Sequence, residues 1–128
     1  MGLCSSKVCM SRNGLEMCVQ MKGSCELSDL ISGAQDDVKM DLFYVSVRNG
    51  STRRVDISPL HFYGITRQGL AVTLDAPLYE SIEWRTKLTR TRLGPQGESE
   101  GYLFFPCSMG HVDRLIYAGE PFFEIQLF

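Results

Sequence analysis

Hydrophobic and polar residues alternate in short runs along most of the chain. Residues 40–48 form the clearest run, because Phe43, Val45 and Val47 fall on one side and Tyr44, Ser46 and Arg48 on the other. A period of two is typical of a β-strand with one face in a core. β-branched and aromatic side chains suit that pleated surface. We therefore predict a strand over residues 40–48, ended by the Asn-Gly-Ser sequence that follows.

Turn residues divide the rest of the chain into further short strands. Residues 7–12 and 15–21 flank Asn13-Gly14, a dipeptide that supplies the positive φ angles of a tight hairpin turn. Residues 23–38 are polar and are interpreted as a connection, and residues 75–84 are the one stretch with helical character. The remaining predicted strands cover residues 54–58, 60–66, 70–74, 85–93, 101–105, 114–117 and 121–128.

Short strands at regular spacing predict an all-β fold, namely an antiparallel sandwich of about seven to nine strands. A chain of 128 residues has the usual size of one domain, so we expect a single domain over 1–128 with a cysteine-rich N-terminal segment, 1–38. Its 44% hydrophobic and 22% charged residues are ordinary for a globular protein. That composition excludes a disordered chain and a collagen-like fibre.

The charge balance argues against nucleic acid as a partner. Thirteen basic and fifteen acidic residues give a net charge of −2, whereas nucleic-acid binders usually carry a basic excess. Basic side chains do gather in one stretch, at Arg85, Lys87, Arg90 and Arg92. We interpret this stretch as a solvated face, with a contact site for an anionic partner as the alternative. The acidic residues between positions 26 and 41 lack the ligand spacing of a calcium loop.

Export is left open by the first residues. No apolar run approaches the roughly 18 residues of a membrane span, so we expect no transmembrane segment. Residues 1–10 do not resemble a signal peptide, so the protein is either cytoplasmic or the mature form of an extracytoplasmic one. Gly2 and Ser6 fit a myristoylation pattern with Cys4 as a second acylation site, while the bulky Leu3 disfavours a bacterial lipid anchor at Cys4.

Four of the five cysteines lie early in the chain. They are Cys4, Cys9, Cys18 and Cys25, and the fifth is Cys107. The gaps do not suit a structural zinc site, which usually has two close pairs. Disulfides are the better interpretation for an exported protein, and the odd count leaves one thiol over. Which cysteines pair is open.

Methionines interleaved with these cysteines suggest an alternative role in handling copper. Met10, Met17 and Met21 are soft ligands that suit Cu(I) together with thiolates. Strand alternation explains the same pattern without a metal, because Leu15, Met17, Val19 and Met21 would share one face. We favour packing and expect no cofactor.

Catalytic constellations are weak. Cys107 and His111 could act as nucleophile and base, but they lie in a predicted loop and no third, orienting group is identifiable. No glycine-rich loop leads into a helix that could hold a phosphate. We therefore expect that this protein is not an enzyme. Six aromatic residues could present a binding surface, although we favour core packing for them: Tyr44, Tyr63, Tyr79, Trp84, Tyr102 and Tyr117.

Six short sequence segments in the last two-thirds of the chain form a recognisable series. They are Phe43-Tyr44-Val45-Ser46-Val47-Arg48-Asn49, Pro59-Leu60-His61-Phe62-Tyr63-Gly64-Ile65, Gln68-Gly69, Leu93-Gly94-Pro95-Gln96-Gly97, Gly101-Tyr102-Leu103-Phe104-Phe105-Pro106 and Leu115-Ile116-Tyr117. With them, residues 41–128 resemble a bacterial family of telokin-like, immunoglobulin-like domains of unknown function, found in secreted proteins and lipoproteins. The resemblance implies an immunoglobulin-like sandwich and a non-catalytic envelope or extracellular module, with no catalytic residues to carry over.

Three hypotheses for function follow. The first is a non-catalytic, immunoglobulin-like binding or structural module of the cell envelope that recognises a protein or a surface. The second is a redox or copper-handling module that uses the N-terminal cysteines and methionines. The third is a small thiol enzyme that uses Cys107 and His111.

Overall fold

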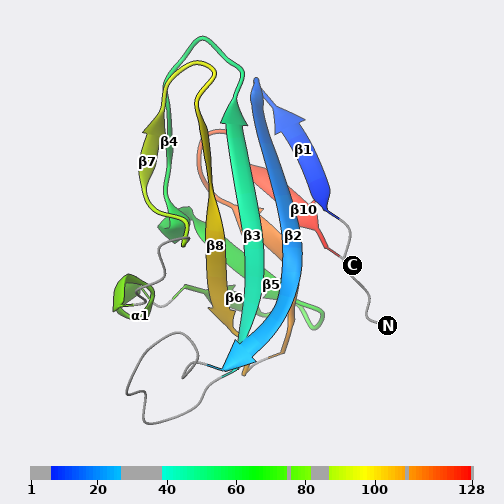
Figure 1. Ribbon diagram of the computed structural model, residues 1–128. Helices are drawn as coiled ribbons and strands as arrows, with labels where there is room; N and C mark the ends of the chain where they lie inside the picture. The colour runs from blue at the N-terminus through cyan, green and yellow to red at the C-terminus, as the bar shows by residue number, and fades with distance from the viewer. Residues whose placement is uncertain (1–6, 27–38, 75, 82–86, 109, 128) are drawn as a thin grey trace.

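The computed structural model describes residues 7–26, 39–74, 76–81, 87–108 and 110–127. Two four-stranded antiparallel sheets pack face to face (Figure 1). The first sheet has the order β1-β2-β3-β8, with β1 Val8–Arg12, β2 Leu15–Glu26, β3 Lys39–Asn49 and β8 Glu98–Pro106. The second has the order β10-β9-β5-β6, with β10 Phe123–Gln126, β9 Val112–Tyr117, β5 Phe62–Thr66 and β6 Ala71–Thr73. A separate ribbon pairs β4 Val55–Ile57 with β7 Thr91–Leu93. The predicted all-β antiparallel sandwich is therefore confirmed.

The core lies between the two sheets. Phe43, Val45 and Val47 of β3 all point into it, as their alternation predicted. The first sheet adds Leu15, Met17, Val19, Leu103 and Phe105, and the second adds Phe62, Leu115, Tyr117, Phe123 and Ile125. Alternate residues of β3 face outwards, so one strand pattern defines both the core and the outer face of the first sheet.

We predicted a connection over residues 23–38, but its predicted start is too early, because the strand β2 continues to Glu26. The pairing of β2 with β3 shifts register between Met21 and Gly23, and Gly23 has a φ of 117°. Glycine adopts that angle without steric cost, so the strand passes through a bulge and continues. Ser24 and Cys25 then pair with Asp41 and Met40 of β3.

Two further strand predictions were too long. At the start of the predicted strand 60–66 the chain forms a short 3₁₀ helix, Pro59–His61. Ser58 caps this helix, because its hydroxyl oxygen accepts a hydrogen bond from the Leu60 N–H. Of the predicted strand 85–93 the structure describes residues 87–93, and within them only β7 is a strand. Leu88 is buried against the core, and Lys87 makes a single parallel bridge to Tyr102. The helix α1, Ala76–Ser81, lies inside the stretch predicted to be helical.

Part of the outer face of the first sheet is covered near β8. Tyr79 of α1 packs on Phe104, with ring centroids 5.9 Å apart. Its hydroxyl lies 2.6 Å from the Leu88 carbonyl oxygen and 2.8 Å from that of Tyr102. Tyr79 therefore fixes residues 87 and 88 alongside β8, while Glu98 and Glu100 at the start of β8 stay exposed.

Gly101 makes this close approach possible, and Gly101→Ala tests it. A Cβ at position 101 would lie 2.5 Å from the Leu88 backbone nitrogen and 2.6 Å from its Cα. These are backbone atoms, so the strand and the segment beside it must separate. We expect a loss of about 2 kcal/mol in the free energy of unfolding. Urea denaturation measures it, with Gly94→Ala as the matched control, since a Cβ there meets nothing within 4 Å. Equal stability of the two variants would contradict this packing.

A buried asparagine ties two loops together at the end of β3. Its Nδ2 donates to the carbonyl oxygens of Arg53 (2.7 Å), Leu93 (3.1 Å) and Gly94 (3.1 Å). The Oδ1 of this residue, Asn49, accepts hydrogen bonds from the N–H and the hydroxyl of Ser51. The side chain therefore joins the β3–β4 loop to the segment between β7 and β8.

Candidate functional site

The predicted N-terminal hairpin carries a disulfide. Asn13 and Gly14 have φ angles of 52° and 83°, and β1 pairs with β2 on either side of them. Cys9 lies directly opposite Cys18, and the two are joined by a disulfide. The sequence analysis left the pairing open, although a two-residue turn at 13–14 already places positions 9 and 18 opposite each other.

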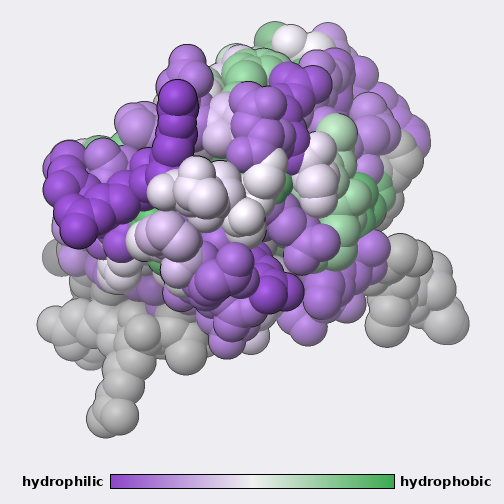
Figure 2. All heavy atoms as spheres, turned by 90° about the horizontal axis from the view of Figure 1, so that it is seen from above, coloured by the Kyte–Doolittle hydropathy of each residue, from purple (hydrophilic) through white to green (hydrophobic). Residues whose placement is uncertain are grey.

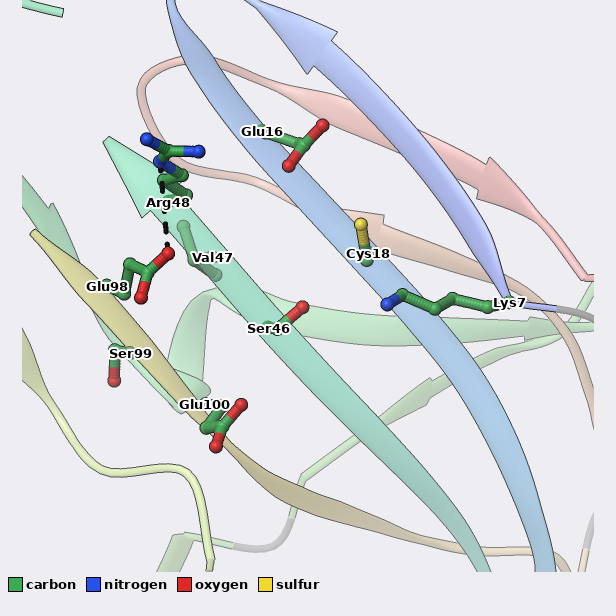
Figure 3. Close-up of a pocket in the computed structure, with 9 residues that line it drawn as sticks. All are labelled: Lys7, Glu16, Cys18, Ser46, Val47, Arg48, Glu98, Ser99 and Glu100. Atoms are coloured by element: carbon green, nitrogen blue, oxygen red, sulfur yellow. Dashed lines mark ion pairs between the residues drawn. The ribbon is translucent and has the colours of Figure 1, made fainter. Parts of the chain in front are cut away.

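The disulfide lies beside a hollow on the outer face of the first sheet (Figure 3). The hollow has a volume of about 460 Å³ and spans β2, β3 and β8, with Lys7, the residue before β1, also lining it. It is lined by Lys7, Glu16, Cys18, Ser46, Val47, Arg48, Glu98, Ser99 and Glu100. Arg48 forms an exposed ion pair with Glu98, with 3.8 Å between Nε and Oε1. Two cationic and three anionic side chains thus share one shallow surface, which suits a polar partner better than an apolar small molecule.

Two of the six candidate aromatic residues adjoin this hollow. The rings of Tyr44 and Tyr102 pack edge to face at 4.9 Å on the outer face, and both side chains are half-buried. Burial and a hydrogen bond to Glu100 raise the pKa of Tyr44, so the hydroxyl stays protonated. Tyr79 and Tyr117 are core residues, as we favoured. Tyr63 lies on β5 of the other sheet, and Trp84 lies outside the described residues.

The basic stretch of the sequence does not present a row of available cations. Lys87 donates to the carbonyl oxygens of Tyr79 and Glu80. Arg92 forms an ion pair with Asp56 at 3.0 Å. Arg90 is exposed, and Arg85 lies outside the described residues. Two of the four residues therefore have partners within the protein, which weakens the hypothesis of an anionic contact here.

A second hollow, of about 760 Å³, includes the pair Arg53 and Arg54. Asp56 and Glu120 line it too, so its charge is mixed. At the end of the sandwich that carries the β1–β2 and β3–β4 turns, the visible surface is predominantly hydrophilic (Figure 2). Nothing at this end favours one class of ligand.

The copper hypothesis does not fit the N-terminal segment. The disulfide leaves Cys9 and Cys18 without thiolates to bind a metal. Met17 is fully buried in the core while Cys18 faces outwards, because neighbouring residues of a strand point to opposite faces. Cys25 and Cys107 carry thiols, and Cys4 lies outside the described residues.

A cluster that the sequence analysis missed lies where β8 crosses to β9. Asp41 on β3 is fully buried, and its Oδ2 accepts a 2.9 Å hydrogen bond from the Val112 N–H of β9. Its Oδ1 accepts from the Ser24 hydroxyl at 3.0 Å and lies 2.9 Å from Nδ1 of His111. Ligand-type atoms of Asp41, Cys107 and His111 all lie within 4.8 Å of one another.

Asp41 is thus the third group that the pairing of Cys107 with His111 lacked. The signal for it was local, because Asp41 interrupts the apolar face that continues with Phe43 and Val45. An acidic residue in a core register needs partners. The identity of those partners depends on a contact across about 70 positions of sequence.

The environment of Cys107 does not favour a nucleophile. Burial, the charge of Asp41 and a hydrogen bond to Asp41 raise the pKa of the Cys107 thiol to about 11. A nucleophilic cysteine needs the opposite shift, towards the thiolate.

Slow alkylation of Cys107 is the expected consequence. From the ordinary value of 9.0 to about 11, the thiolate fraction at neutral pH falls roughly a hundredfold. Higher intrinsic nucleophilicity restores about a factor of ten. We therefore expect metal-free protein at pH 7.5 to react with iodoacetamide at Cys107 about tenfold more slowly than glutathione does. Peptide mass spectrometry measures the rate, and unfolding in urea should remove the difference. A rate above that of glutathione would revive the thiol-enzyme hypothesis.

The comparisons with known proteins concern the fold. No family model and no curated protein sequence matches the chain. Among solved structures, the YjhA protein of Bacillus subtilis is similar with a TM-score of 0.62 and 12% identity, over 94% of this chain and 96% of that one. The secreted protein MPT63 of Mycobacterium tuberculosis is similar with a TM-score of 0.55 and 11% identity, over 88% and 83%.

A predicted lipoprotein of Bacillus subtilis, YcdA, is similar with a TM-score of 0.59 and 18% identity. The match covers 95% of this chain but 39% of YcdA. Among the described residues, no helix has the length and apolar character needed to cross a membrane. At these identities the likeness concerns architecture, and the telokin-like resemblance stays a prediction. The chain has an all-β fold, an immunoglobulin-like antiparallel sandwich.

Proposed function

We propose that this chain is a non-catalytic, extracytoplasmic immunoglobulin-like module that binds a protein partner of the cell envelope. The observation that carries the proposal is the outer face of the first sheet, where the charged hollow adjoins the Tyr44–Tyr102 pair and the disulfide-linked hairpin.

The disulfide supports the location. Disulfides persist in oxidising compartments and are rare in the cytosol of most organisms. Cys9 is exposed on β1, an edge strand, so a reducing cytosol would have ready access to the bond. A secreted protein and a predicted lipoprotein among the structures of similar fold agree with this location.

The chemistry of the outer face supports the binding role. Tyrosine offers a large contact area with few rotatable bonds and is enriched at protein interfaces. The charged residues around the hollow are exposed and carry both signs, so they can select a partner of complementary pattern. The raised pKa of the Cys107 thiol supports a non-catalytic role, because the cysteine–histidine pair lacks an activated nucleophile.

Site-specific photocrosslinking in the producing cells tests the proposal. A benzoylphenylalanine at position 46 lies inside the hollow, and one at position 73 lies on an exposed residue of β6 in the other sheet. We expect a discrete protein adduct from Ser46 and none from Thr73. The further change Glu100→Lys should reduce the yield of that adduct at least threefold. Equal labelling from both positions, or none from Ser46, would reject this face as the binding surface.

A further inference from the structure

We propose that Asp41, Cys107 and His111 bind one zinc ion, and that this ion pins β3 to the crossover between the two sheets. The site is distinct from the outer-face hollow, and Asp41 is 70 positions away from His111 in the sequence. It also differs from the N-terminal cluster considered for copper, since it shares no residue with it.

The ligand set suits zinc. Carboxylate, thiolate and imidazole are its three usual protein ligands, and structural and catalytic sites alike place them around a tetrahedron. The three ligand atoms lie within 4.8 Å of one another, which leaves room for a central ion after small side-chain rotations. A thiolate and an imidazole argue against calcium and magnesium, which take oxygen ligands.

The backbone holds two of the ligands on one short turn. Cys107 and His111 are separated by three residues, a spacing within the range of zinc motifs. The Gly110 N–H donates to the Cys107 carbonyl oxygen at 3.1 Å, and Gly110 has a φ of 119°. The turn therefore brings both side chains towards the same carboxylate.

The carboxylate is oriented before any ion arrives. The Val112 N–H holds Oδ2 of Asp41, and the Ser24 hydroxyl holds Oδ1. Such second contacts fix the direction of a metal-binding carboxylate and raise affinity. Asp41 is fully buried, whereas the side chain of His111 is 67% exposed, so an ion can enter from the solvent side.

The competing interpretation is a purely structural hydrogen-bond cluster. Asp41 is hydrogen-bonded to both His111 and Cys107, and no buried side-chain nitrogen or oxygen in the described part of the chain lacks a partner. Both interpretations predict that Asp41 matters for stability. They differ in whether Cys107 ever becomes a thiolate ligand, so the test must report on the sulfur.

Cobalt(II) provides that report, because a thiolate bound to it gives a charge-transfer absorption band in the near ultraviolet. Tag-free protein, treated with EDTA and handled without oxygen or reductant to preserve the disulfide, is titrated with cobalt chloride and then with zinc chloride. We expect one cobalt ion per chain, a thiolate band, and loss of the band when zinc displaces cobalt. Zinc should also raise the melting temperature.

Matched variants decide the assignment. Cys107→Ser should abolish the thiolate band, and His111→Ala should weaken zinc binding more than tenfold; the exposed position of His111 makes its variant safe for folding. Ser24→Ala should weaken binding about tenfold through the carboxylate. Cys25→Ser and His61→Ala, outside the cluster, should change neither. Absence of a thiolate band in the wild type, or a band that survives Cys107→Ser, would overturn the proposal.

Discussion

Asn49→Asp is expected to lower the free energy of unfolding by about 4 kcal/mol at pH 7, a large part of the 5–15 kcal/mol typical of a small domain. The Nδ2 of Asn49 donates to three carbonyl oxygens at 2.7–3.1 Å, and its side chain is fully buried. A carboxylate of the same shape offers no donor and places a charge against three acceptors. The penalty combines three lost hydrogen bonds with an unpaired buried charge.

Urea denaturation with a matched surface control measures this effect. Gln96→Glu adds the same charge on the same side of the sandwich, at an exposed residue that accepts a hydrogen bond from Arg48. We expect that change to stay within about 0.5 kcal/mol of the wild type. Ser51→Ala should be intermediate, at about 1 kcal/mol, since it removes only the hydroxyl that donates to Oδ1 of Asn49. A stable Asn49→Asp protein would show that the asparagine does not join the loops.

Asp41→Ala is the second change with a large expected effect, a loss of about 3 kcal/mol in the presence of EDTA. The Val112 N–H and the Ser24 hydroxyl lose their acceptor, and Val112 is itself buried. Because Asp41 lies on β3 and Val112 on β9, the lost bond is one between the two sheets. Hydrogen exchange at the Val112 amide should accelerate beyond the change in global stability.

Asp113→Ala serves as the control for this variant. Asp113 is only partly buried, and its carboxylate accepts one long hydrogen bond, at 3.5 Å, from Gln126. We expect its loss to cost less than 1 kcal/mol. If Asp41→Ala were no more damaging than Asp113→Ala, the buried carboxylate would have no role in joining the sheets.

Local patterns predicted the strands well where the side-chain alternation was uninterrupted. β3 follows from Phe43, Val45 and Val47, and the first hairpin follows from Asn13-Gly14. The pattern failed at Gly23, where a positive φ angle and a β-bulge let the strand continue past a residue that we expected to end it. It failed again at Leu88, which is buried by tertiary contacts with β8.

The candidate sites were less predictable because they depend on contacts distant in sequence. Cys107 and His111 could be singled out together, but Asp41 joins them only through the packing of β3 against the start of β9. The outer-face hollow likewise arises from the register of three strands, which brings Glu16, Ser46 and Glu100 to one surface. Charge runs in the sequence pointed instead to Lys87 and Arg92, whose side chains have partners within the protein.

The central claim is that this sandwich works outside the reducing cytosol, with one disulfide on its edge hairpin. Mapping cysteines in protein isolated from its native host, alkylated under denaturing conditions before any reductant is added, tests the claim most directly. We predict a peptide pair joined through Cys9 and Cys18, with Cys25 and Cys107 found alkylated. Finding Cys9 and Cys18 alkylated as well would contradict the account, because the protein would then have matured where disulfides do not persist.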